Sequence, residues 1–101
     1  MEGIAVITIR LAKEYLASPV FCSDVDTMGH VEVEDLPISQ NLKIAIKNWD
    51  AEYQATYNED YPPDSGFNSL EEDADHVSRG AVLAEMLQSE LRMSYIVKYE
   101  P

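Results

Sequence analysis

Two stretches of helical periodicity, separated by a proline-containing loop, constrain the fold of this chain more than any other feature. Ser39 is placed to cap the first helix, whose apolar residues recur every three or four positions over about four turns. Ser69 and Glu72 form an S-x-x-E capping box before a second helix of about six turns. The predicted apolar stripes are Leu42, Ala45, Ile46, Trp49, Tyr53, Thr56 and Tyr57 in the first helix, and Leu70, Ala74, Val77, Ala81, Ala84, Leu87 and Leu91 in the second.

Segments rich in β-branched and aromatic residues lie on either side of the helical part. Residues 4–11 (IAVITIRL) are apolar on both faces, as expected for a strand near the middle of a sheet. Residues 93–99 (MSYIVKY) alternate and predict a closing strand. Residues 20–22 predict an edge strand or an extended tie, and residues 23–36 predict a surface loop that could hold a brief turn of strand. Two prolines and a glycine in residues 58–68 (NEDYPPDSGFN) predict an ordered loop between the helices.

These elements predict a single-domain α+β fold for residues 1–101. The simplest arrangement pairs the N- and C-terminal strands in a small antiparallel sheet and packs two antiparallel helices on one face of it. Of the 101 residues, 46% are hydrophobic, which suits one folded domain rather than a disordered acidic tail.

The charge of the chain is strongly one-sided. Seven basic and nineteen acidic side chains give a net charge of -12, which repels phosphate backbones and anionic lipid and so disfavours direct nucleic-acid and membrane binding. Between Asn48 and Ser78 there is no Lys or Arg at all. An ordinary solvated surface mixes charges of both signs, and a one-signed surface costs folding stability. This pattern favours an acidic surface that recognises a cationic macromolecule over a merely solvated face.

The residues predicted to bind that partner lie in and around this acidic tract. Among the aromatic residues, Trp49 and Tyr53 lie on the first apolar stripe and are expected in the core, while Tyr95 and Tyr99 are expected to line the sheet. Tyr61 and Phe67 lie in the proline loop, where anchoring the loop and displaying a ring to a partner are equally supported. The predicted partner-binding residues are Asp50, Glu52, Glu59, Asp60, Tyr61, Asp64, Phe67, Glu71, Glu72 and Asp75.

Catalytic and metal sites are disfavoured by the available residue types and their spacing. A small enzyme could use Cys22, His30 and His76 as catalytic residues, but no catalytic motif contains them. Cys22 is expected to be a small buried hydrophobe, and solvated histidines are expected at the other two positions. We therefore predict no catalytic residue and no cofactor.

Two acidic clusters could suggest calcium, namely Asp24-x-Asp26 and Asp73-x-Asp75-His76. Neither is followed by the glycine and the distant glutamate of a calcium loop, and residues two apart on a helix face different sides. We predict no metal site.

The protein is expected to act in the cytoplasm. The single cysteine cannot form a disulfide within the chain, which fits a reducing compartment. Residues 1–10 lack the basic start and cleavage region of a secretory signal, and no segment reaches the roughly 20 apolar residues of a membrane span.

Residues 49–67 read W-D-x-x-Y-x-x-T-x-N-x-D-Y-P-P-D-S-G-F. This segment resembles small acidic bacterial proteins of toxin and immunity gene pairs, including those of contact-dependent growth inhibition, and the likeness covers residues 36–99. The resemblance implies a stoichiometric inhibitor that binds the toxic domain of a larger secreted protein, often a nuclease, in the cytosol. It assigns no binding residue to this chain.

A physical mechanism accompanies that role. A nuclease presents a basic groove to phosphates, so an acidic domain is steered to the groove at about 10⁸ M⁻¹s⁻¹ or more at low salt and excludes the substrate. Long residence needs a buried anchor, for which Tyr61 and Phe67 are the candidates. The free inhibitor is expected to be a monomer or weak dimer. The alternative function is a non-enzymatic adaptor or assembly subunit that uses its helical face in a stable oligomer.

Overall fold

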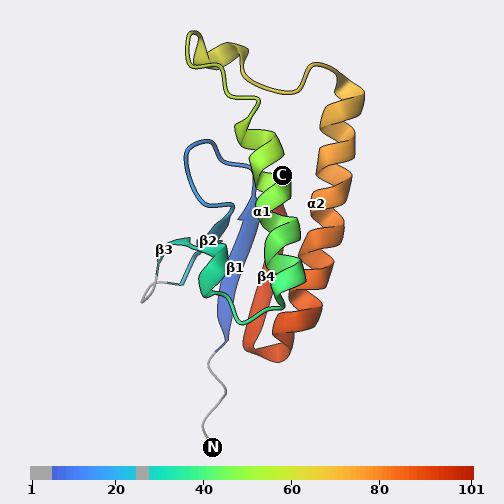
Figure 1. Ribbon diagram of the computed structural model, residues 1–101. Helices are drawn as coiled ribbons and strands as arrows, with labels where there is room; N and C mark the ends of the chain where they lie inside the picture. The colour runs from blue at the N-terminus through green and yellow to red at the C-terminus, as the bar shows by residue number, and fades with distance from the viewer. Residues whose placement is uncertain (1–5, 25–27) are drawn as a thin grey trace, which may run out of the picture.

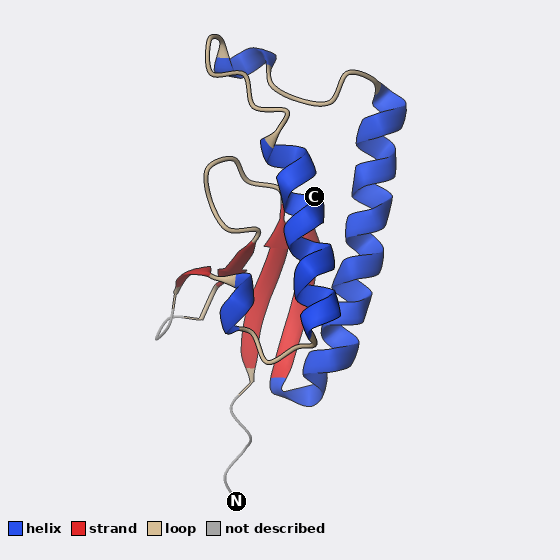
Figure 2. Ribbon diagram, in the orientation of Figure 1, coloured by secondary structure: helices blue, strands red, loops and turns tan. Residues whose placement is uncertain are grey.

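The computed structural model describes residues 6–24 and 28–101, and it has two layers, a sheet and a pair of helices (Figure 1). The helices α1 and α2 are antiparallel and cover one face of the sheet, as predicted (Figure 2). Three short 3-10 helices, η1, η2 and η3, lie in the connections. The elements in chain order are β1 (Ile7–Ala12), β2 (Val20–Cys22), β3 (Gly29–Val31), η1 (Val33–Asp35), α1 (Gln40–Gln54), η2 (Pro62–Asp64), α2 (Leu70–Leu91), η3 (Arg92–Ser94) and β4 (Tyr95–Glu100).

The four-stranded sheet has the order β3-β2-β1-β4, which places β1 in the interior of the sheet as predicted. The beginning of the predicted first strand, residues 4 and 5, lies outside the described residues. β2 pairs antiparallel with both β1 and β3, so residues 20–22 form a strand, but it lies inside the sheet and the prediction of an edge strand or an extended tie was wrong in this respect. β3 is a short strand within the segment predicted as a surface loop that could hold one.

The two terminal strands pair in parallel, from Ile7 opposite Tyr95 to Ala12 opposite Glu100. The sheet is therefore mixed, and the prediction of an antiparallel sheet was wrong for this pair of strands. The reason is the path of residues 32–39, which return the chain to the end of the sheet where β1 begins (Figure 1). Because α1 then runs in the direction of β1 and α2 runs back, β4 must run with β1.

Both predicted helix caps are confirmed. The Ser39 side chain accepts a hydrogen bond from the Leu42 backbone N–H at 3.2 Å, and Ser69 accepts one from the Glu72 N–H at 3.1 Å. The first apolar stripe is confirmed within α1, which buries Leu42, Ile46 and Trp49. Because the helix ends at Gln54, the last two stripe residues, 56 and 57, lie in the turn that follows.

The apolar stripe predicted for α2 is correct only in its C-terminal half, where Ala84, Leu87 and Leu91 are buried. In the N-terminal half, Leu70 is 89% exposed, and the buried residues are His76 and Gly80. This half of α2 packs against a large indole ring, which leaves room for a glycine and a flat imidazole. The expectation that His76 is solvated was therefore wrong, because its exposed fraction is 0%.

The core lies between the sheet and the two helices. Cys22 is 2% exposed, which confirms its predicted role as a buried hydrophobe, and Tyr95 and Tyr99 pack against the core from β4 as predicted. Among the described residues, neither helix is both long and apolar enough to cross a membrane. The fully or nearly buried apolar residues are Ile9, Leu11, Val20, Cys22, Val33, Leu36, Leu42, Ile46, Trp49, Leu83, Ala84, Leu87 and Leu91.

Candidate functional site

The residues predicted to bind a partner fall in three separate places. Glu52 and Asp75 lie on the outer face of the helices, and Asp50 lies on the opposite side of α1, because residues two apart on a helix point to different sides. The others cluster in the proline loop, residues 58–68, and the first turn of α2. We call residues 58–72 the loop end; it extends past the end of the sheet (Figure 1). Its predicted members are Glu59, Asp60, Tyr61, Asp64, Phe67, Glu71 and Glu72.

Hydrogen bonds donated by backbone N–H groups hold the proline loop in one shape. The Asn58 side-chain oxygen accepts hydrogen bonds from the N–H groups of Asp60 and Tyr61, both at 3.0 Å. The Asn58 N–H donates to the Ser65 hydroxyl at 2.8 Å, and the Gly66 N–H donates to the Thr56 carbonyl at 3.1 Å. Gly66 has φ +133°, a value that residues with a Cβ rarely adopt. The loop is therefore ordered, as predicted, and is shaped before any partner arrives.

The two rings of this loop have different positions. The Phe67 ring is half-buried and lies 4.9 Å from the His76 ring and 6.4 Å from the Tyr53 ring, measured between centroids. Phe67 thus anchors the loop on the core. Tyr61 is 61% exposed, and its ring makes no ring contact within the described part of the chain. Of the two roles left open by the sequence, Phe67 has the anchoring one and Tyr61 is displayed.

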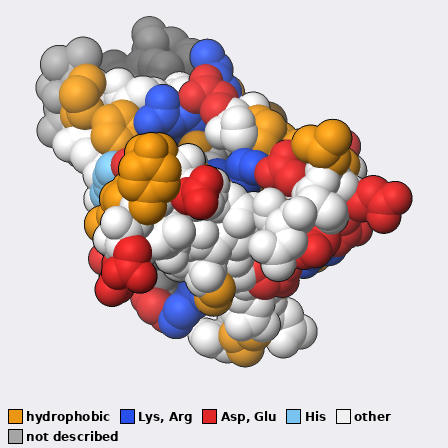
Figure 3. Space-filling model, turned by 90° about the horizontal axis from the view of Figure 1, so that it is seen from above, with side chains coloured by type: hydrophobic (Ala, Val, Ile, Leu, Met, Phe, Trp, Pro, Cys, Tyr) orange, Lys and Arg blue, Asp and Glu red, His pale blue; other side chains and the backbone are white. Residues whose placement is uncertain are grey.

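The acidic side chains differ in how they are paired. Arg79 binds both carboxylate oxygens of Glu52, at 2.6 and 2.9 Å, and its Nε donates to Asp75 at 2.8 Å. This pairing lowers the pKa of Glu52 and raises that of Arg79. Lys13 reaches Asp73 from the sheet side at 3.2 Å. Cations from outside the acidic tract therefore neutralise part of it, and Figure 3 shows Lys and Arg among the acidic groups when the loop end faces the viewer.

The carboxylates of the loop end have no such partner within residues 6–24 and 28–101. All of them are exposed. A hollow of about 300 Å³ lies beside them, and the residues that line it include Asp64, Phe67 and Glu72. This arrangement can accept hydrogen bonds from cationic side chains without first breaking an internal ion pair. The unpaired carboxylates are those of Glu59, Asp60, Asp64, Glu71 and Glu72.

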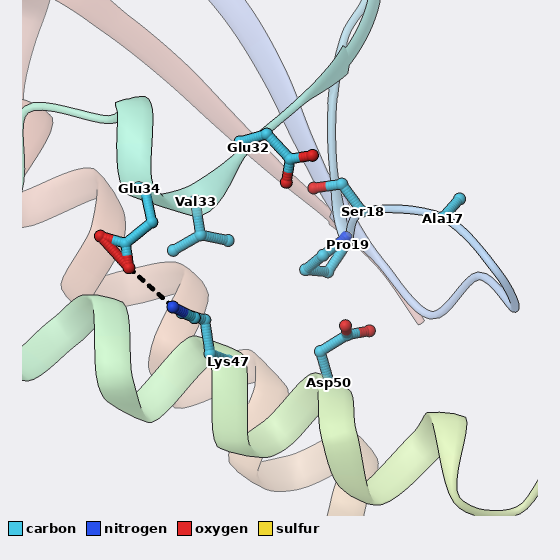
Figure 4. A pocket seen from close by; sticks show the side chains of 8 residues that line it. All are labelled: Ala17, Ser18, Pro19, Glu32, Val33, Glu34, Lys47 and Asp50. Carbon is cyan, nitrogen blue, oxygen red and sulfur yellow. Dashed lines mark hydrogen bonds and ion pairs between the residues drawn. The ribbon is translucent and has the colours of Figure 1, made fainter.

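Asp50 lines a different hollow, of about 360 Å³, between α1 and the segments that contain η1 and residues 17–19. Figure 4 shows Asp50 and Glu32 facing this space, with the Lys47–Glu34 ion pair, 2.7 Å long, on its wall. Asp50 accepts a hydrogen bond from Gln54 at 3.1 Å, and burial raises the pKa of its carboxyl group. Residues 32–34 were not predicted to line a site, since they lie in a segment without periodicity.

A reciprocal contact between Trp49 and His76 supports the loop end and was not predicted. The Trp49 indole N–H donates to the His76 carbonyl at 2.8 Å, and His76 Nε2 donates to the Trp49 carbonyl at 2.7 Å. Because a carbonyl oxygen only accepts, Nε2 must carry the hydrogen. The two rings stack with centroids 4.6 Å apart and planes 7° from parallel. The four-residue spacing of His76, Gly80 and Ala84 is the sequence signal for this buried face.

The residues considered for an enzyme are not brought together. Cys22 faces the core, whereas His30 is on the opposite face of the sheet, where its Nε2 lies 2.7 Å from a Glu14 carboxylate oxygen. His76 is enclosed by aromatic rings between the helices.

The two acidic clusters considered for calcium are likewise not assembled into a site. Asp73 pairs with Lys13 and Asp75 with Arg79, so the two carboxylates face different sides of α2, as expected. Asp26 lies outside the described residues. In the described parts of the chain, no group of three or more His, Cys, Asp or Glu side chains could hold a metal ion.

Comparisons with known proteins identify the family. A comparison with curated proteins found no match. Residues 7–101 match the model of the family described as Serratia CdiI immunity protein-like. The match runs from the first residue of β1 to the end of the chain and so includes the N-terminal strands, beyond the range of the resemblance seen in the sequence. The chain therefore belongs to the Serratia CdiI immunity protein-like family.

Proposed function

We propose that this immunity protein neutralises its cognate toxin in the cytosol by placing the loop end against a basic surface of the toxin domain, and that the toxin is a nuclease. Membership in a family of CdiI-like immunity proteins supports toxin neutralisation in general. The choice of surface and of toxin class rests on the physical argument that follows.

One observation carries the choice of surface: an exposed tyrosine, Tyr61, lies on an ordered loop among carboxylates that form no ion pair with any of the residues that the structure describes. Aromatic side chains are enriched among the residues that dominate binding energy. A loop that is already ordered loses little conformational entropy on binding. The loop end thus combines a ring for the centre of an interface with charges for its rim.

The charge of the chain favours a basic partner, and a nuclease must bind phosphates. With a net charge of -12, the chain is attracted over a distance to a groove that has evolved to hold polyanions. Such steering raises the association rate and is weakened by salt. A nuclease whose groove is covered by this domain cannot bind its substrate.

The proposal is tested with the toxin domain encoded next to the gene of this chain. Replacing Asp60 and Asp64 by Lys should slow association with this domain by at least about tenfold and flatten its dependence on salt. The matched control replaces Asp35 and Glu85 by Lys, which changes the net charge equally at exposed positions away from the loop end. Equal effects of the two double variants would show that only net charge matters and would remove the loop end from the interface.

A second substitution separates the anchor from the charges. Tyr61→Ala should chiefly speed dissociation, because it removes buried contact area and leaves the long-range field unchanged. Unchanged association and dissociation rates for this variant would show that the ring is outside the interface.

One observation favours the alternative role as an adaptor or assembly subunit. The outward faces of α1 and α2 expose Ile44, Val82 and Met86, with exposed fractions between 43% and 54%. A stable oligomer would bury such a surface. Light scattering on the purified chain decides between the two functions, because a partnerless inhibitor is expected to be a monomer or weak dimer.

A further inference from the structure

Leu16 occupies a backbone conformation that leucine rarely adopts. It lies in the turn between β1 and β2, where its φ is 62°, and its side chain is 78% exposed. In this left-handed region the Cβ atom crowds the backbone, so turns that need it normally use Gly or Asn. Arg92, at the C-terminal end of α2, is the other non-glycine residue with positive φ in the described chain, and its ψ of -139° lies outside the αL conformation that commonly ends helices. No helix end explains the conformation of Leu16.

Contacts on both sides of Leu16 hold it in this conformation. Its N–H donates to the Gln54 side-chain oxygen at 3.0 Å, and the Gln54 amide donates back to the Glu14 carbonyl at 2.7 Å. The neighbouring Tyr15 points inward, with its ring stacked on Tyr53 at a centroid distance of 4.1 Å. The turn is therefore clamped to the end of α1, with the tyrosine directed into the protein and the leucine into solvent.

The clamped turn lies beside the loop end. The Tyr15 hydroxyl is hydrogen-bonded to the Thr56 hydroxyl at 2.5 Å, and its ring lies 5.1 Å from the Tyr57 ring. Residues 56 and 57 lead directly into the proline loop. Leu16 and Tyr61 are thus two exposed apolar side chains, presented by neighbouring ordered loops.

We propose that Leu16 is an apolar contact residue that inserts into a hydrophobic pocket of the same toxin domain; this inference rests on the function proposed above. Strained backbone conformations persist where the surrounding structure imposes them, and they concentrate at binding sites. A large apolar side chain whose backbone is fixed beforehand loses little freedom when it becomes buried. Within this chain, the side chain contributes little, since most of its surface is in water. Its chemistry suits a partner that buries it.

Leu16→Asn is the decisive variant. Asparagine tolerates the left-handed conformation and keeps the backbone N–H that Gln54 binds, but it removes the apolar group. The midpoint of urea unfolding should be equal to that of the native chain or higher, while dissociation from the toxin domain encoded by the adjacent gene should be at least tenfold faster. Met93→Asn is the matched control, because Met93 is also 78% exposed but lies on η3, at the opposite end of the molecule. This control should dissociate like the native chain.

Two results would overturn the inference. Dissociation of Leu16→Asn at the native rate would show that the leucine does not contact the toxin. A lower unfolding midpoint for Leu16→Asn would show that the leucine serves the fold. The function itself fails in a different way: if the native chain does not bind the toxin domain, both proposals fall, whereas native binding that is unaffected by Leu16→Asn removes this one alone.

Discussion

For Gly80→Ala, helix propensity predicts a gain in folding stability, whereas the packing around Gly80 predicts a loss. In the interior of a helix, alanine is normally more stable than glycine by about 1 kcal/mol. Gly80 lies within α2, where a Cβ atom would meet the Tyr99 hydroxyl oxygen and lie 2.5 Å from Trp49 Cζ2 and 2.9 Å from Trp49 Cε2. Distances of this kind do not occur between non-bonded carbon atoms, so one of the rings must move.

Neither ring is free to move. Trp49 is 2% exposed, its N–H is bonded to the His76 carbonyl at 2.8 Å, and its ring is stacked on the His76 ring. Tyr99 donates its hydroxyl hydrogen to the Val77 carbonyl at 2.7 Å. Overpacking of a core costs about 1–3 kcal/mol, and a lost hydrogen bond about 1 kcal/mol. After the gain in helix propensity is subtracted, the expected loss of folding stability is about 1–3 kcal/mol, or about 5–20 °C in Tm.

Urea unfolding followed by the fluorescence of Trp49, the single tryptophan, measures this difference. Ser78→Ala, at an exposed position of the same helix, is the control and should be neutral or slightly stabilising. Removing the nearest obstacle with Tyr99→Phe in the Gly80→Ala background should recover part of the loss. A Gly80→Ala variant as stable as the native chain would refute the packing described for α1, α2 and β4.

Three further substitutions test other parts of the structure. Gln88→Ala should lower the unfolding free energy by about 1 kcal/mol, because the Gln88 amide bonds the Tyr95 carbonyl and the Val97 N–H, both at 2.8 Å, at the open edge of β4; an unchanged urea midpoint would contradict this. Glu52→Gln should lower stability near neutral pH by less than about 1 kcal/mol, since its partly exposed ion pair with Arg79 lowers the pKa of Glu52. That contribution is present above the pKa that the carboxyl group has in the unfolded chain, and it is lost as the pH falls through the pKa that it has in the folded chain. The free energies of unfolding of the native chain and the variant should therefore converge in acid, and a difference between them that does not depend on pH would contradict this. Asp50→Asn should raise the free energy of unfolding near neutral pH, because burial raises the pKa of Asp50 and its charged form therefore destabilises the fold. This gain should be lost in acid, and a lower free energy of unfolding near neutral pH would contradict the prediction.

The features that could be predicted from the sequence are those that depend on neighbours along the chain. The caps at Ser39 and Ser69, the core face of α1 and the order imposed on the proline loop each follow from a local rule, and each is present. The interior position of β1 followed from its two apolar faces. The α+β fold class could therefore be predicted from the sequence.

The features that could not be predicted depend on contacts between distant segments. In α2, Leu70, Ala74 and Ala81 form a more hydrophobic stripe than His76 and Gly80. The face with His76 and Gly80 is nevertheless the buried one, because it packs against the ring of Trp49. The parallel direction of β4 depends on the path of residues 32–39, which have no periodicity. The local sequence pattern predicts neither the buried face of α2 nor the direction of β4.

The candidate site shows the same division. The sequence identified the acidic tract but not the cations that neutralise part of it, because Lys13 lies sixty positions from Asp73 along the chain. Likewise, nothing in a leucine at position 16 indicates a left-handed backbone, which follows from the clamp made by Gln54. The loop end therefore holds only some of the predicted partner-binding residues, and no signal in the sequence pointed to the turn that contains Leu16.

We propose that the loop end covers the catalytic surface of a basic nuclease. Titration of the toxin domain encoded next to this chain with the purified chain, followed by nuclease activity, tests this interaction. We predict complete inhibition at one chain per toxin domain, with inhibition strongly weakened when Asp60 and Asp64 are replaced by Lys. Full nuclease activity in the presence of excess folded chain would show that the loop end does not block the catalytic surface.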